Sequence, residues 1–325
     1  MKILIIGAAG MIGRKLTDAL CAPGRWQGPA ITALRLADVI EAPLPAGAPE
    51  DTVSLVSDLS APGAAEALVA ERPDCIFHLA AIVSSDAEAN FDKGYRVNFD
   101  GTRALFEAIR AEGEKTPYRP RLVFTSSLAV FGSPLPDTIP DDYPTAPLTS
   151  YGAQKAMAEL LLGDYSRRGF FDGIGIRLPT ICIRPGVPNK AASGFYSSIL
   201  REPLQGKEAV LPVEESLRHW FASPRAAVGF LLHAGVIDLA KVGPRRTLNM
   251  PGVSATVGEE IEALKRFAGP EAAKLIRREP DPAIDAIVQT WAQRFDPQRA
   301  LALGFRADAS LDEIIKVFLE DELGR

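Results

Sequence analysis

The stretch KILIIGAAGMIG, at residues 2–13, decides how the chain begins to fold. Residues 2–6 form an apolar run rich in isoleucine, which is typical of a strand buried on both faces of a sheet. Glycines follow at positions 7, 10 and 13, and a helical pattern of apolar residues begins at Met11. A buried strand, a glycine-rich turn and a helix in this order predict the first β-α unit of a parallel sheet.

Strand-like and helix-like segments alternate through the first half of the chain. The further strand-like segments read ALRLADV, TVSLVSD, CIFHLAA, RLVFTSS and IGIRLPTI. Their continuous apolar character is expected when helices cover both faces of a parallel sheet. This pattern predicts an α/β fold, a doubly wound parallel sheet of the Rossmann type, over residues 1–185, to which part of 222–250 returns.

The second half is less regular, and residues 186–325 are predicted to form a smaller, mostly helical lobe. Helices are expected after the loop that begins at residue 186 and near residues 225–237, 256–268, 283–294 and 310–322. The proline-rich stretch 134–147 is predicted to be a loop beside the functional site.

The composition excludes several classes of function. The net charge is −5, and the basic residues are spread along the chain, so neither nucleic acid nor a membrane surface is an expected partner. The scattered cysteines and histidines predict neither a disulfide framework nor a metal site; they are Cys21, Cys75, Cys182, His78, His219 and His233. Without a signal peptide or an apolar run of about 18 to 20 residues, the expected location is the cytoplasm.

The glycine-rich turn predicts a site for a pyrophosphate. Its glycines allow close approach of a phosphate, which the free amides at the start of the next helix can bind; the residues concerned are Gly7, Gly10, Met11, Ile12 and Gly13. Asp38 ends the second strand, where a carboxylate can accept the hydroxyls of an adenosine ribose. Since no arginine follows in VIEA, NAD is favoured and NADP is left as a minor possibility. A structural turn and an ordinary strand-end carboxylate remain the alternatives.

Two further strand ends are expected beside the same cofactor. Asp58 and Leu59 end the third strand, where an adenine would lie. The fourth strand closes with small residues that leave room for a cofactor, namely Leu79, Ala80 and Ala81. His78, which precedes them, is more typical of a hydrogen-bonded core histidine than of a ligand.

Ser127, Tyr151 and Lys155 form a set with a chemical relation. An alcohol that loses hydride to nicotinamide must also lose its hydroxyl proton to a general base. Tyrosine, with an ordinary pKa of about 10, becomes a suitable base when a nearby ammonium favours its phenolate form. Lys155, one helical turn after Tyr151, can supply that charge and bind the nicotinamide ribose, while Ser127 binds the substrate oxygen. Each residue alone is also typical of an ordinary strand end or helix surface; the order after a glycine loop favours catalysis.

The chain resembles the extended short-chain dehydrogenase/reductase family, which includes nucleotide-sugar epimerases and dehydratases. The resemblance rests on GAAGMIG, LADV, SDLS, HLAA, VNFDGT, FTSSLAVFG, YGAQK and IRLPTICIRPG. It implies an NAD-binding sheet, a C-terminal substrate lobe, and catalytic roles for Ser127, Tyr151 and Lys155. It also implies that Asn98 is the family's structural asparagine, and that Pro179, Thr180 and Ile181 pass the nicotinamide.

The second half departs from the epimerase pattern at LRHWFASPRAAVGF, residues 217–230. Arg218 matches the family's arginine, but His219 replaces an aspartate, which disfavours a nucleoside-diphosphate substrate. RPGVPNKAASGFYSSILREPLQG and HWFASPRAA resemble a narrower branch, the D-erythronate dehydrogenases. That resemblance implies oxidation by NAD of the 2-hydroxyl of a four-carbon sugar acid to a 2-oxo acid. A small acidic substrate needs a cation, for which Lys190 and, with its planar fork, Arg218 are candidates; Ser84, Ser126 and Asn189 are candidate partners of its hydroxyls.

Two other functions compete with this prediction. A nucleoside-diphosphate-sugar epimerase would keep NAD tightly bound and return the hydride to the sugar. The pair Leu128-Ala129 after Ser127 offers no acidic group for dehydratase chemistry. A non-catalytic NAD-binding scaffold is disfavoured because both Tyr151 and Lys155 are present. Apolar stripes on helices 99–111 and 151–167 predict a homodimer, although they can equally pack on the sheet.

Overall fold

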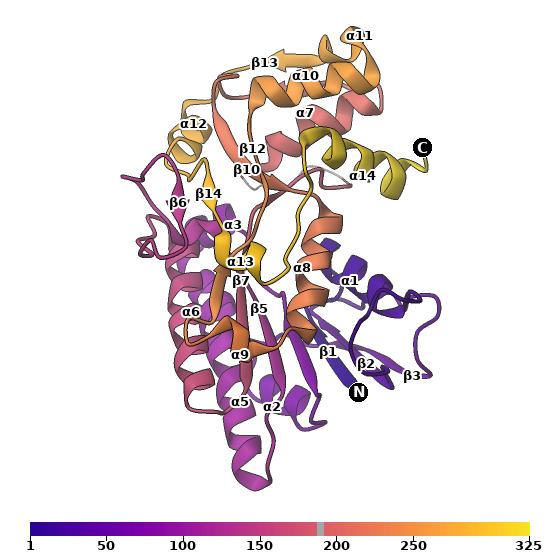
Figure 1. Cartoon of the computed structure of the whole chain (residues 1–325), viewed down its shortest axis with the longest axis vertical. Helices are drawn as coiled ribbons and strands as arrows, with labels where there is room; N and C mark the ends of the chain where they lie inside the picture. The colour runs from indigo at the N-terminus through magenta and orange to yellow at the C-terminus, as the bar shows by residue number, and fades with distance from the viewer. Residues whose placement is uncertain (187–191) are drawn as a thin grey trace. The chain divides into compact units, whose positions relative to one another are not determined.

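The computed structural model describes residues 1–186 and 192–325 (Figure 1). The chain divides into two compact units. The first comprises residues 1–130, 149–177 and 228–248, and the second comprises residues 131–148, 178–227 and 249–325. These boundaries differ from the expected one at residue 185, because residues 131–148 and 178–185 belong to the second unit.

The first unit is built on a seven-stranded sheet with the strand order β11-β7-β5-β4-β1-β2-β3. The strands are β1 (Lys2–Ile6), β2 (Ala33–Asp38), β3 (Asp51–Val56), β4 (Cys75–His78), β5 (Arg121–Ser127), β7 (Asp172–Leu178) and β11 (Thr247–Asn249). Strand β1 pairs in parallel with β2 on one side and with β4 on the other. The strand order therefore reverses at β1, and ligands of such sheets bind at the carboxyl ends of the strands at that point.

Helices and short helical turns connect these strands and cover the sheet (Figure 1). They are α1 (Met11–Cys21), α2 (Ala64–Val69), α3 (Ser84–Ala89), α4 (Phe91–Gly94), the π-helix η1 (Tyr95–Asp100), α5 (Gly101–Lys115), the 3-10 turn η2 (Leu128–Val130), α6 (Ser150–Arg167), α8 (Pro224–Val236) and α9 (Leu239–Val242). Apolar side chains of α2, α5 and α6 pack on strands β1, β4 and β5 in one buried core. Helix α6 begins after Thr149, whose side chain accepts a hydrogen bond from the amide of Gly152.

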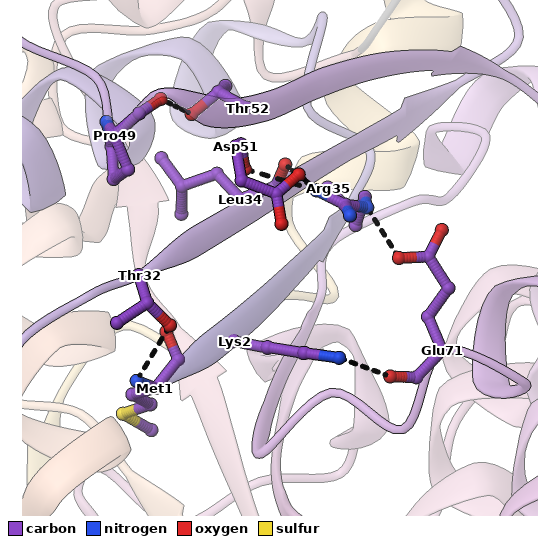
Figure 2. A network of polar contacts seen from close by, with 9 residues as sticks. All are labelled: Met1, Lys2, Thr32, Leu34, Arg35, Pro49, Asp51, Thr52 and Glu71. Carbon is purple, nitrogen blue, oxygen red and sulfur yellow. Dashed lines mark hydrogen bonds and ion pairs between the residues drawn. The ribbon is translucent and has the colours of Figure 1, made fainter.

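Charged residues join the amino-terminal ends of β1, β2 and β3 (Figure 2). The guanidinium of Arg35 donates to Glu71 Oε2 at 2.6 Å and to Asp51 Oδ1 at 2.8 Å. The ammonium of Lys2 donates to the carbonyl of Glu71 at 3.4 Å. This network lies at the edge of the sheet opposite the carboxyl ends, so it is separate from the expected ligand site and contributes to holding the strands together.

The described residues of the second unit form three small sheets and a set of helices. Its strands are β6 (Ile139–Pro140), β8 (Thr180–Ile181), β9 (Ala209–Leu211), β10 (Arg218–Ala222), β12 (Val253–Thr256), β13 (Ile276–Arg278) and β14 (Phe295–Asp296). Its helices are α7 (Gly194–Leu204), α10 (Val257–Ala268), α11 (Pro270–Ala273), α12 (Pro282–Val288), α13 (Gln298–Ala302) and α14 (Leu311–Leu323). The expected helices at 256–268 and 310–322 are confirmed within one residue at each end.

Two expectations for this unit were wrong in detail. The helix expected at 283–294 ends at Val288, because the Thr290 hydroxyl donates to the carbonyl of Ile287 and the chain turns toward β14. The stretch 134–147 is not entirely a loop, since residues 139 and 140 form β6 and pair with β14. Across the described residues, no helix is both long and apolar enough to cross a membrane.

Candidate active site

The glycine loop after β1 is packed so tightly that two of its glycines are required by the protein itself. Gly7 has a φ of +94°, and a Cβ there would lie 2.7 Å from the amide nitrogen of Ala80. A Cβ on Gly13 would overlap the carbonyl oxygen of Gly7. A Cβ on Gly10, in contrast, would come no closer than 3.4 Å to the carbonyl of Gly7. The fold thus has room for a side chain at Gly10. A phosphate that approaches the backbone there would leave no room for that side chain.

The N-terminus of α1 suits an anion. Within the described chain no side chain caps this helix, and its first turn contains no acidic residue. The amides of Met11, Ile12 and Gly13 belong to that first turn, whose N–H groups lack intrahelical partners. They can therefore donate to a pyrophosphate, and the helix dipole favours the negative charge. The residues of this loop fit the cofactor that the sequence predicts.

Asp38 lies beside the glycine loop at the end of β2. Its carboxylate accepts hydrogen bonds from the amide of Ala9 at 2.8 Å and from the amide of Val39 at 2.7 Å. An ionised carboxylate has about four lone-pair sites, so two remain for ribose hydroxyls. Asp58 accepts bonds from the amide and hydroxyl of Ser60, which hold the pKa of Asp58 below its ordinary value. Asp58 thereby fixes the turn that ends in the buried Leu59.

The segment after β4 packs on the glycine loop. The amides of Leu79 and Ala80 both donate to the carbonyl of Ile6, at 2.8 and 3.0 Å. His78 is buried, and its Nε2 lies 2.8 Å from the hydroxyl of Thr102. Burial and, to a smaller extent, the charge of Lys155 together lower the pKa of His78 to about 3, so this histidine is neutral. His78 is a core histidine, as expected, and Leu79, Ala80 and Ala81 are half-buried at the strand end.

Lys155 joins the predicted catalytic residues of β5 and α6. Its ammonium donates to the carbonyl of Thr125 at 2.9 Å and lies 5.8 Å from the centroid of the Tyr151 ring. Ser127 is the last residue of β5, and its hydroxyl accepts a bond from the amide of Ala129 at 3.1 Å. Tyr151 is half-buried in the first turn of α6. The structure therefore brings Lys155 to the ring of Tyr151, one turn back along the same helix.

The electrostatics of Lys155 are governed by burial. The side chain is fully buried, and loss of solvent lowers the pKa of Lys155 to about 8, while the charge of Glu159 opposes the change. At pH 7 about nine in ten Lys155 side chains are then still protonated. An ammonium held close to a phenol favours the phenolate, so this arrangement can activate Tyr151 as a base.

Asn98 connects the strand-end segments to helix α6. Its side chain accepts from the amide of Ile82 at 2.9 Å, donates to the carbonyl of Ile82 at 3.2 Å, and donates to Gln154 Oε1 at 2.8 Å. Asn98 lies in the π-helix η1, and Gln154 directly precedes Lys155. These bonds fix the start of α6 and with it the position of Tyr151.

Of the predicted substrate-binding residues, Ser126 and Arg218 already have hydrogen-bond or ion-pair partners within the fold. Ser126 is only 3% exposed and its hydroxyl donates to Glu159, so the prediction that it binds substrate is not supported. Ser84 is half-buried at the start of α3. Arg218, in the second unit, donates to the carbonyl of Ser254 and pairs with Glu259 at 3.3 Å. A substrate carboxylate at Arg218 would have to compete with that pair.

The remaining predicted residues lie at the start of the second unit. Pro179 and Ile181 are buried, and Thr180 lies between them in β8. The hydroxyl of Thr180 is 2.6 Å from Nε2 of the buried His219. Asn189 and Lys190 fall outside the described residues.

Sequence reasoning missed two charged residues beside the predicted triad. Glu159, on α6, forms a largely buried ion pair with Arg177 of β7 at 2.7 Å. The spacing of Lys155 and Glu159, four residues apart in one helix, was the available signal for Glu159. Nothing local marked Arg177, which lies two strands away along the chain.

Comparison with known proteins places this site in a family. The model of the NAD dependent epimerase/dehydratase family matches residues 3–229. The chain belongs to that family. NAD is accordingly its cofactor, and the glycine loop and Asp38 have the geometry to hold it.

The individual relatives carry three different names. A D-erythronate dehydrogenase of Cupriavidus necator is 46% identical over 99% of this chain and 98% of that protein. One of Haemophilus influenzae is 44% identical over 99% of this chain and its own full length. The crystal structure of a nucleoside-diphosphate-sugar epimerase from Agrobacterium tumefaciens is 64% identical, with a TM-score of 0.97 over 100% of this chain and 95% of that one. An L-threonine dehydrogenase from Cupriavidus necator, 23% identical with a TM-score of 0.85, shares the fold.

Proposed function

We propose that the protein is an NAD-dependent dehydrogenase that oxidises the 2-hydroxyl of a small sugar acid, D-erythronate, to a 2-oxo acid. The observation that carries the proposal is the buried ammonium of Lys155, held by the carbonyl of Thr125 beside the ring of Tyr151. The names of the two curated relatives support the choice of D-erythronate.

In this mechanism Tyr151 takes the proton of the substrate hydroxyl. Lys155 stabilises the phenolate of Tyr151 by its charge, and its remaining donors bind the nicotinamide ribose. The hydroxyl of Ser127 binds the reacting oxygen and keeps it within reach of Tyr151. When bound, NAD supplies the acceptor for the hydride that leaves C2 of the substrate. The amides at the start of α1 would hold the pyrophosphate of NAD, and Asp38 would hold its adenosine ribose.

The direct test is NADH formation when purified protein is mixed with NAD and a panel of small sugar acids. The proposal expects the highest kcat/KM with D-erythronate and a loss of turnover in Tyr151→Phe of about 100-fold or more, the scale of general-base catalysis. Near-normal turnover by a folded Tyr151→Phe variant would refute the role of Tyr151. Turnover of other acids but not of D-erythronate would refute D-erythronate as the substrate and would leave the role of Tyr151 as the base unaffected.

A second candidate is a nucleoside-diphosphate-sugar epimerase, because the Agrobacterium tumefaciens structure of 64% identity carries that name. An epimerase would be purified with tightly bound NAD and would interconvert UDP-sugars without net NADH formation. The residues of the first unit suit both reactions. The same assay therefore separates the candidates, with UDP-sugars added to the panel.

The remaining proposals concern assembly and location. We propose a homodimer formed through α5 and α6; Leu160 on α6 has 74% of its surface exposed, which supports an apolar contact there. A monomer in light scattering would remove this proposal. We also propose a cytoplasmic location, which the free thiols of Cys21, Cys75 and Cys182 support.

A further inference from the structure

A buried charge network lies directly behind the predicted catalytic residues. Glu159 is 8% exposed and lies one helical turn beyond Lys155 on α6. It accepts a hydrogen bond from the hydroxyl of Ser126 and bonds from Arg177, whose Nε and Nη2 donate at 2.9 and 2.7 Å. The side chain of Arg177 is itself only 11% exposed.

This network is poorly explained by stability alone. Removing a carboxylate and a guanidinium from water costs several kcal/mol for each ion, and apolar residues often replace buried ion pairs without loss. The fold has ample apolar packing at the same place, since the neighbouring Ala158 and Leu162 of α6 are fully buried. A buried carboxylate at this position therefore calls for a role that an apolar side chain could not perform.

Hydrogen bonds join α6 to two successive residues at the end of β5. Lys155 donates to the carbonyl of Thr125, and Glu159 receives the hydroxyl of the next residue, Ser126. Arg177 adds a third attachment, from α6 to β7. Ser127, which follows Ser126 directly, is thereby held in register with the helix that carries Tyr151.

The charges around Lys155 come from three elements. Glu159 lies on the same helix and supplies the negative charge that opposes the desolvation of Lys155. His78, on β4, is neutral because its pKa is about 3. Arg177, on β7, is a cation whose charge is balanced by Glu159. Loss of the carboxylate of Glu159 would remove from Lys155 the negative charge that opposes its desolvation.

We propose that Glu159 is a positioning residue that keeps Lys155 protonated beside Tyr151, and that Ser126 and Arg177 hold its carboxylate in place for this task. The proposal deepens the proposed function, since a charged Lys155 matters only if Tyr151 acts as the base. The electrostatic part, however, concerns Lys155 itself and can be measured without any substrate.

The primary test is an NMR titration of Lys155 in the full chain labelled with [ε-13C]lysine, its signal assigned by its absence from Lys155→Met. In Glu159→Gln, which keeps the shape but removes the charge, the pKa of Lys155 is expected to fall by about 1 unit or more. Asp164→Asn is the matched control, because it removes an exposed carboxylate from the same helix. An unchanged pKa of Lys155 in folded Glu159→Gln would overturn the proposal.

A second variant covers the case in which Glu159→Gln does not fold. Glu159→Gln/Arg177→Gln replaces the buried ion pair by two neutral amides, so the guanidinium is removed together with its carboxylate partner. The pKa of Lys155 is again expected to fall, because the carboxylate is lost, but by less, because the positive charge of Arg177 is removed with it. No change in this variant would equally overturn the proposal.

Kinetics then test the link to function. The alkaline limb of kcat/KM, where Lys155 loses its proton, is expected to move to lower pH in Glu159→Gln by the same amount as the NMR titration. A purely structural role would lower kcat/KM equally at every pH and would contradict the proposal. If D-erythronate is not turned over by the wild type, the proposed function fails, while the titration still decides the role of Glu159.

Discussion

Replacement of Lys155 by methionine is predicted to stabilise the protein while abolishing its activity. Burial lowers the pKa of Lys155 from its ordinary value of 10.5 to about 8. Below pH 8 the folded and unfolded states both hold the proton, so the folded state carries the full cost of a buried ammonium. At 1.36 kcal/mol per unit of pKa this cost is roughly 3 kcal/mol.

The pH dependence has a definite sign. As the pH rises from 8 toward 10.5, the folded state releases the proton before the unfolded state does, and the stability of the wild type increases. The cost is therefore roughly 3 kcal/mol at pH 7 and roughly 1 kcal/mol at pH 9.5. The lost hydrogen bond to the carbonyl of Thr125, about 1 kcal/mol, does not depend on pH and offsets part of the gain.

The assay is urea unfolding of wild type and Lys155→Met at pH 7 and pH 9.5, without NAD. The difference in unfolding free energy is expected to shrink by about 2 kcal/mol between the two pH values. Lys115→Met is the control, since the side chain of Lys115 is 70% exposed and should show no such change. A Lys155→Met variant that is less stable by the same amount at both pH values would refute the reasoning.

Three further predictions concern the cofactor site and the second unit. Gly13→Ala is expected to unfold or misfold, because its Cβ would overlap the carbonyl oxygen of Gly7. Gly10→Ala should fold normally by circular dichroism but bind NAD at least about tenfold more weakly in calorimetry. Normal NAD binding by Gly10→Ala would contradict the assignment of this loop to the pyrophosphate. Asp38→Ala removes the acceptor of the Ala9 and Val39 amides, so NAD affinity should fall about tenfold or more by fluorescence titration, and unaltered affinity would exclude Asp38 from the site. Thr256→Ala breaks the capping box of α10 with Glu259 and should lower the unfolding free energy by about 1 kcal/mol in urea, with no change in NAD affinity.

The sequence was sufficient to predict those features of the site that depend on residues close together along the chain. The glycine spacing predicted a loop between β1 and α1, and the four-residue spacing of Tyr151 and Lys155 predicted that they share a helix face. Both features follow from local backbone geometry, which a run of letters specifies directly.

Features that depend on distant pairing could not be predicted in the same way. Ser126 was expected to bind substrate, because its strand position gave no sign that its hydroxyl donates a hydrogen bond to Glu159, 33 residues later. Residues 131–148 were expected in the first unit, but β6 pairs with β14 more than 150 residues further on, and this pairing draws the segment into the second unit. Arg218 was expected near a substrate carboxylate, while Glu259 on α10 offers it a partner within the fold.

NADH formation by the wild type and by Tyr151→Phe, with D-erythronate and NAD and followed at 340 nm, tests the proposed substrate and the proposed base together. We predict steady NADH formation by the wild type and a loss of about 100-fold or more in the folded variant. Wild-type protein that forms no NADH with any sugar acid, yet interconverts a UDP-sugar, would contradict the account and favour the epimerase.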